Sequence, residues 1–519
     1  MLQSLVKIEY KTEADQLKKV FVEVMIEVSK TIPQTPVIVD IERVSLAIPH
    51  LELLSQEMLD DIPDTDNSLL WAFLGVALFY QGQGQYNLAE RYLDNCLKAV
   101  QSRLGENHPD VATSLNNLAS LYCSQGRYAE AESLYLQALE LGQRLLGENH
   151  PDVATFLNNL ASLYRSQGNY EEAELLYLHV LELSERPLRE NHPDVATFLN
   201  NLASLYRSQG NYEEAELLYL HVLELGQRLL GENHPYVATS LNNLALLYKY
   251  QGRYEEAEPL YLQALELRQR LLGENHPDVA SSLNNLAKLY HSQGRYKEAE
   301  LLHLQALELG QRLLGENHPD VANSLNNLAE LYRSQGRYEE AEPLYLQALE
   351  LGQRLLGKNH PDVATSLNNL ASLYCSQGRY EEAEPLYLQA LELGQRLLGK
   401  NHPDVATSLN NLALLYNTQG KYVKAEALSR QALIIYWQTL GTQHPKTEDA
   451  LLATRMFSMQ ILLHCNTEIL FSILQALAQQ TGLTVFNTEV ALRMIEVLES
   501  NTELLLQVRK FLQRDTQTL

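Results

Sequence analysis

Two stretches of this chain come close to the phosphate-binding loop G-x-x-x-x-G-K-[ST]. Both read GQRLLGKN, at Gly352 to Asn359 and at Gly394 to Asn401. That loop needs Ser or Thr after the lysine, and it must lie between a strand and the start of a helix. Both stretches end in Asn and stand where a helical pattern ends. We therefore expect no nucleotide site in either place.

Histidine and cysteine could bind a metal or act as nucleophiles, but neither is spaced for that role. The histidines that precede proline recur every 42 residues, too far apart to share metal bonds of about 2 Å, which favours a role in turns. The cysteines form no C-x-x-C pair and are typical of reduced cytosolic thiols. No Ser/His/Asp or Cys/His set stands apart, so we predict no catalysis, cofactor or metal. These histidines are His108, His150, His192, His234, His276, His318, His360, His402 and His444, and the cysteines are Cys96, Cys123, Cys375 and Cys465.

An asparagine pair recurs with the same period. Asparagine is a middling helix former, so a pair inside a helix needs a reason. Its carboxamide both donates and accepts hydrogen bonds, and could therefore bind a peptide backbone of any sequence. The alternative is that these amides only bind neighbouring helices and fix the stack. The second members of the pairs are Asn117, Asn159, Asn201, Asn243, Asn285, Asn327, Asn369 and Asn411.

Selectivity should lie where the repeats differ. The position six residues after the second asparagine is mostly basic, and the position three residues after it also varies. A basic strip in an acidic protein would attract a carboxylate-bearing peptide; alternatively, it only balances local glutamates. The first column is Cys123, Arg165, Arg207, Lys249, His291, Arg333, Cys375 and Asn417. The second is Ser120, Ser162, Ser204, Leu246, Lys288, Glu330, Ser372 and Leu414.

These residues are carried by a repeat of 42 residues, best seen from His108 to Asn149. A period of this length indicates a helical or other solenoid array. Pro109 suits the first turn of a first helix, and Gly126 a turn before a second helix that starts near Tyr128. Both helices carry apolar residues at helical spacing. Residues 66–107 are a diverged first copy, which makes nine repeats.

The motifs H-P-D-V-A, L-N-N-L-A-x-L-Y and Q-G-x-Y-x-E-A-E resemble the tetratricopeptide repeat of the kinesin light chain type over residues 66–443. The resemblance implies an all-α, right-handed superhelical solenoid of antiparallel helix hairpins. The first helix of each hairpin would line a concave groove for extended peptides, and that family takes acidic peptides bearing a tryptophan. It implies no chemistry, and no motor, because the heptad segment of the light chains is missing.

Both ends differ from the repeat. We predict a helical cap at 1–65, with a helix from Thr12 to Lys30, the repeats at 66–443, and a helical cap at 444–519 that could instead be a dimerising face. The segments IPQT at Ile32 to Thr35 and AIPHLELL at Ala47 to Leu54 resemble a junction in signalling ATPases of the STAND type. Inside the array, Pro187 should end a helix early, and Tyr236 replaces an Asp and should expose an aromatic ring.

Composition narrows the partners. The formal charge of -25 argues against nucleic acid, whose binding depends on Lys and Arg; glutamates at helix starts, where they favour the dipole and stay in water, explain the acidity. Neither a signal peptide nor an apolar membrane span is recognisable, so we expect a soluble cytoplasmic protein of undetermined oligomeric state.

The favoured hypothesis is a scaffold that binds proteins or peptides through acidic, extended segments. The alternatives are a sensor arm of a split STAND-like system and a structural spacer.

Overall fold

The computed structural model describes residues 2–33, 36, 38–63, 67–185, 193–463, 465–480 and 488–515. All regular structure in these ranges is helical. The chain forms two compact units. The first comprises Met1–Ser166, Glu171–Leu205 and Tyr212–His360, and the second comprises Gln167–Tyr170, Tyr206–Asn211 and Pro361–Leu519. The predicted all-α array of helix hairpins is confirmed, whereas the domain boundaries predicted at 65/66 and 443/444 stay a prediction.

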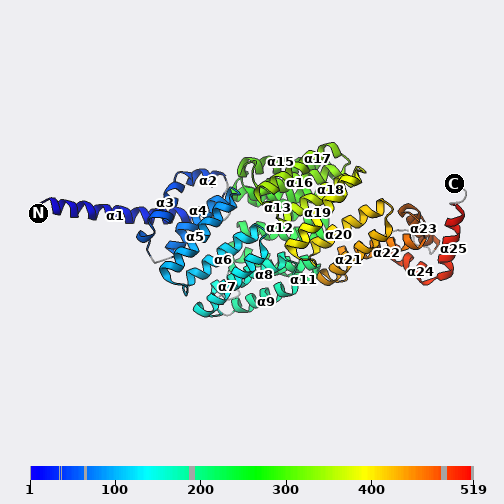
Figure 1. Ribbon diagram of the computed structural model, residues 1–519, viewed down its shortest axis with the longest axis horizontal. Coiled ribbons are helices and arrows are strands. Elements are labelled where there is room, and N and C mark those ends of the chain that lie inside the picture. The colour runs from blue at the N-terminus through cyan, green and yellow to red at the C-terminus, as the bar shows by residue number, and fades with distance from the viewer. Residues whose placement is uncertain are drawn as a thin grey trace. The chain divides into compact units, whose positions relative to one another are not determined.

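The helices follow one another as pairs along the chain (Figure 1). The N-terminal helices are α1 (Leu2–Lys30), α2 (Ile38–Ser45), α3 (Ile48–Glu57) and the short η1 (Leu59–Asp61). The hairpins are α4 (Ser68–Gly82) with α5 (Tyr86–Leu104), α6 (Pro109–Ser124) with α7 (Tyr128–Leu146), α8 (Pro151–Ser166) with α9 (Tyr170–Glu185), α10 (Pro193–Gln209) with α11 (Tyr212–Leu230), α12 (Pro235–Tyr250) with α13 (Tyr254–Leu272), α14 (Pro277–Ser292) with α15 (Tyr296–Leu314), α16 (Pro319–Ser334) with α17 (Tyr338–Leu355), α18 (Pro361–Ser376) with α19 (Tyr380–Leu398), and α20 (Pro403–Thr418) with α21 (Tyr422–Leu440). The C-terminal helices are α22 (Pro445–Leu463), α23 (Thr467–Gln480), α24 (Thr488–Ser500) and α25 (Thr502–Asp515).

From α6 onward, the first helix of a hairpin begins at the proline of the His-Pro pair. In α6, Nδ1 of His108 accepts a hydrogen bond from the backbone N–H of Asp110 at 3.2 Å. Pro109 follows as the first helical residue, where its missing N–H costs nothing. The predicted turn role of the histidines is confirmed as a helix cap at these positions. The same bond recurs at His150, His234, His276, His318, His402 and His444.

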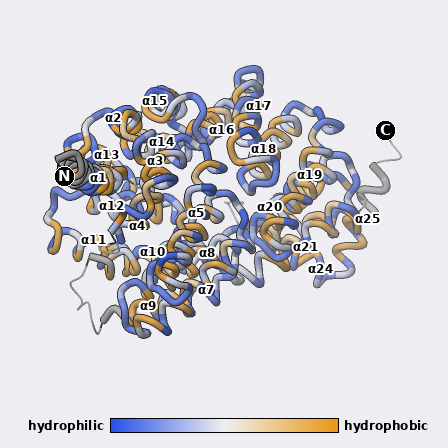
Figure 2. The backbone as a smooth tube through the Cα atoms, turned by 60° about the vertical axis from the view of Figure 1, so that its left-hand side comes forward, coloured by the Kyte–Doolittle hydropathy of each residue, from blue (hydrophilic) through white to orange (hydrophobic). Residues whose placement is uncertain are grey.

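Small and aromatic residues together form the packing between the two helices of a hairpin. Ala119, Ala131 and Ala138 are fully buried, so the helix backbones can approach closely. Tyr135 fills the space beside them and is 3% exposed. Figure 2 shows hydrophobic and hydrophilic residues alternating along many of the helices, as expected when one face packs against a neighbour.

An arginine at the turn of a hairpin joins consecutive repeats. Arg127 donates to both oxygens of Glu130 at 2.7 and 2.6 Å and to Glu90 of the preceding repeat at 2.7 Å. Its guanidinium also lies 3.7 Å from the ring centre of Tyr122. The glutamates at the helix starts therefore do more than favour the dipole. Arg253, Arg295 and Arg337 repeat this arrangement.

The regions outside the regular repeats are also helical. In the second unit, Met459, Leu470 and Ile495 belong to one buried cluster that joins α22, α23 and α24. Pro187, Gln34 and Thr35 lie outside the described residues. The expected exposure of Tyr236 is wrong, because its hydroxyl is buried and its ring packs against Gly226.

Candidate binding face

The asparagine pairs form hydrogen bonds between the first helices of neighbouring hairpins. Asn159 donates through Nδ2 to Oδ1 of Asn116 in the preceding repeat at 3.0 Å. The same bond joins Asn201 to Asn158 at 2.9 Å, Asn243 to Asn200 at 2.8 Å and Asn285 to Asn242 at 3.0 Å. At these four positions the amides fix the stack, which is the alternative that the sequence left open.

Four other predicted asparagines make no such bond among the described residues: Asn117, Asn327, Asn369 and Asn411. In two repeats the first asparagine of a pair donates instead to a serine of the next repeat. Asn284 donates to Ser324 at 3.0 Å and Asn368 to Ser408 at 2.7 Å. All eight predicted asparagines are half-buried. Their role in peptide binding stays a prediction.

The first two basic residues of the column, Arg165 and Arg207, lie near the ends of first helices. Arg165 donates through Nη1 to Ser204 of the next repeat at 2.8 Å, and its buried Nε donates to no atom of the described part of the chain. No carboxylate pairs with Arg165 among the described residues, so its charge remains available. Arg207 lies in the last turn of α10, in a segment that belongs to the second unit.

Farther along the first unit, Lys249 of α12 and Lys288 of α14 lie close enough for one charge to influence the other. Burial, and then repulsion from Lys288, lower the pKa of Lys249 to about 8. Burial also lowers the pKa of Lys288. The described residues place no carboxylate in an ion pair with either lysine. Two half-buried positive charges without a counterion are unfavourable in the free protein, and a bound anion would relieve both.

His291 and Arg333 contribute less charge than their residue types suggest. Burial lowers the pKa of His291, although Glu330 opposes this effect, so the ring is neutral at neutral pH. Arg333 donates to Glu330 through Nε at 2.9 Å and Nη2 at 2.6 Å. Tyr345 donates to the same carboxylate at 2.7 Å. From Lys249 to Arg333, the positive charge of the column is therefore concentrated on Lys249 and on the neighbouring Lys288.

Two residues that contribute to the charge and packing of this face, Lys288 and His303, were not predicted from the sequence. Lys288 stood in the second variable column but was not counted as part of the strip. His303 replaces the tyrosine found at this point of other repeats, such as Tyr261 and Tyr345. It is 1% exposed, bonds Asn284 at 2.9 Å, and has its pKa lowered to about 3 by burial and then by nearby cations. A break in the tyrosine column was the available signal.

The described residues contain no cluster of three or more His, Cys, Asp or Glu side chains able to hold a metal. No single helix among them is both long and apolar enough to cross a membrane, although the bent pair α22 and α23 passes by length and composition.

The sequence of this chain matches the model of one protein family. The tetratricopeptide repeat matches residues 68–141, 110–186, 194–270, 236–312, 302–354, 320–384 and 362–436. The comparison with curated proteins found no match.

Several solved structures are similar to parts of this chain. BtubC (BKLC) from P. vanneervenii is 31% identical over 44% of this chain and 91% of its own, with a TM-score of 0.37. A kinesin light chain-like protein of Podospora anserina with nearly identical TPR-like repeats is 28% identical over 40% of this chain and 97% of its own, with a TM-score of 0.34. A Rap protein complexed with competence and sporulation factor is 15% identical over 74% of this chain and 99% of its own, with a TM-score of 0.48. The predicted resemblance to kinesin light chain repeats is confirmed.

Proposed function

Because the chain belongs to the tetratricopeptide repeat family, whose members typically bind protein or peptide partners, we propose that it is a non-catalytic cytoplasmic scaffold for acidic, extended peptide segments. The first helices of the hairpins would present the binding face. Lys249 and Lys288 would bind a carboxylate of the partner, and Arg165 a second one. The uncommitted amides of Asn117 and Asn327 would bind the partner's backbone.

One observation carries the proposal: the pair Lys249 and Lys288. Both side chains are half-buried, each has a lowered pKa, and no described carboxylate neutralises them. Residues that only balanced local glutamates would sit beside one, as Arg333 sits beside Glu330. A partner carboxylate supplies the missing counterion. Nothing described bears on the sensor arm or the spacer, which stay predictions.

The test is the fluorescence anisotropy of a labelled, glutamate-rich peptide that carries one tryptophan. Charge-assisted hydrogen bonds contribute about 1.5–3 kcal/mol each, so the variant K249Q/K288Q should bind at least about tenfold more weakly. The matched control is K358Q/K400Q, in which two exposed loop lysines are changed in the same way. Equal affinity of the two variants would refute the proposal, as would equal binding of the peptide with glutamine in place of glutamate.

A further inference from the structure

The start of α21 differs in charge from the starts of most other second helices. Second helices such as α19 begin Tyr-Glu-Glu-Ala, whereas α21 begins Tyr422-Val423-Lys424-Ala425. Its first turn has no acidic residue, whereas that of α19 has Glu381 and Glu382. Lysine there faces the positive end of the helix dipole, and Val423 is 69% exposed. Neither residue helps this hairpin to fold.

An arginine–glutamate pair that other repeats have at the start of the second helix is missing from α21. At the start of α19, Arg379 donates to both oxygens of Glu382 at 2.7 Å. In α21 the arginine becomes Lys421, and the position of Glu382 is taken by Lys424. Lys421 is left with Glu384 at 3.9 Å, and Lys424 has no carboxylate partner among the described residues. One carboxylate of the repeated arrangement is therefore absent, and a second cation stands in its place.

The two lysines remain close together. Nζ of Lys421 lies 5.2 Å and Nζ of Lys424 lies 5.3 Å from the ring centre of Tyr416, the ring over which an arginine lies in other repeats. A carboxylate that entered this place would meet two ammonium groups and the unbonded N–H groups of the first turn of α21. This is the position that a glutamate side chain fills in the neighbouring hairpin.

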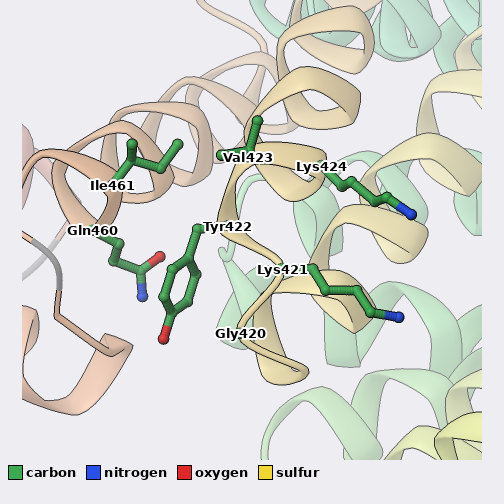
Figure 3. Close-up of a pocket in the computed structure, with 7 residues that line it drawn as sticks. All are labelled: Gly420, Lys421, Tyr422, Val423, Lys424, Gln460 and Ile461. Atoms are coloured by element: carbon green, nitrogen blue, oxygen red, sulfur yellow. The ribbon is translucent and has the colours of Figure 1, made fainter.

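A pocket of about 460 Å³ adjoins the lysines. Gln460 and Ile461 of α22 line it together with Tyr422. Gln460 stands at the position where α20 ends in Thr418, and α22 runs on to Leu463. Figure 3 shows the amide of Gln460 directed toward the ring of Tyr422, with the lysines on the opposite side of the chain.

Gln460 supplies an unused acceptor at the pocket. Its side chain is fully buried, and its Nε2 donates to Thr467 at 2.7 Å. Its Oε1 accepts no hydrogen bond from any residue that the structure describes. A buried carbonyl oxygen without a donor costs free energy, and a backbone N–H of a bound peptide would supply that donor.

We propose that the start of α21 and the adjoining face of α22 form a second peptide-binding site, independent of the lysine pair on the first helices. Its ligand is an extended segment in which an acidic residue stands next to an apolar one. The carboxylate binds Lys421 and Lys424, the apolar side chain covers Val423 and Ile461, and a backbone N–H donates to Oε1 of Gln460.

The test uses a labelled peptide of alternating leucine and glutamate, and the full chain carrying K249Q/K288Q so that the first site is disabled. The variant V423E/K424E restores the helix start of α19, so it should be at least as stable as its parent while binding the probe at least about tenfold more weakly. The exposed loop change K400E is the control and should leave binding unaltered.

Gln460→Met removes the acceptor without adding charge or shortening the side chain, and should weaken binding severalfold. Equal probe affinity of V423E/K424E and K400E would overturn the proposal. So would failure of the K249Q/K288Q parent to bind the probe, or equal binding of a probe with glutamine in place of glutamate. None of these results depends on the first site.

Discussion

Replacing Lys249 by glutamine should stabilise the free protein. Its pKa falls from 10.5 to about 8, mainly through burial, so the folded chain holds a charge that it disfavours at neutral pH. The shift corresponds to at most about 3 kcal/mol, and partial exposure to water reduces this to about 1–2 kcal/mol. K249Q should therefore gain stability locally while losing peptide affinity, a combination that a purely structural lysine would not give.

The gain should depend on pH with a defined sign. Below about pH 8 the lysine is protonated in both the folded and unfolded chains, and the full penalty applies. Between about pH 8 and pH 10.5 the unfolded chain binds more protons than the folded one, so the parent gains stability as pH rises. The advantage of K249Q should thus be greatest near neutral pH and should disappear by about pH 10.5.

Hydrogen exchange of peptides from α12 and α14 measures the stability gained by K249Q in these two helices. A local measurement is suitable because the repeats of such an array need not unfold together. A gain of about 1–2 kcal/mol should slow exchange about fivefold to thirtyfold at neutral pH. The exposed Lys297 of α15 supplies the control K297Q, which should change little. Faster exchange in K249Q, or a gain that is the same at all pH values, would refute the reasoning.

Two further predictions concern the stack. Asn243→Ala removes the donor to Asn200 and should destabilise α10 and α12 by about 1–2 kcal/mol. Asn369→Ala breaks no such bond and should cost less than half of that. Equal hydrogen-exchange rates in the two variants would contradict a stabilising role for the asparagine hydrogen bonds between first helices. His276→Ala removes the cap on the backbone N–H of Asp278 and should cost about 1 kcal/mol, which His276→Asn should largely restore, and thermal melts that did not separate these two variants would argue against a capping role.

Most of the fold could be predicted from the repeat itself. The His-Pro pair, the turn glycine and the apolar spacing each predict one feature of a hairpin, and these predictions agree with one another. The exposure of Tyr236 was wrong because its neighbour Gly226 leaves room for the ring to pack inward. No periodicity within one repeat reveals that space, which arises where two repeats meet.

The candidate site was harder to predict. A basic column can be read from the sequence, but its net charge depends on partners in other helices. Glu330 stands three residues before Arg333, a spacing that allows pairing on a helix, so this neutralisation could have been anticipated. The approach of Lys249 to Lys288 could not, because it depends on how α12 and α14 pack. The direction of each asparagine bond likewise required the three-dimensional structure.

The most direct test of the central claim is the affinity of the unmodified protein for the glutamate-rich peptide as pH rises. A carboxylate should bind the protonated form of Lys249, whose pKa in the free protein is about 8. Affinity should therefore be constant up to about pH 7 and fall by up to about tenfold per pH unit above about pH 8. An affinity that stays unchanged to about pH 9.5, where Lys249 would be mostly neutral, would contradict the assignment of this lysine pair as the site that binds the partner's carboxylate.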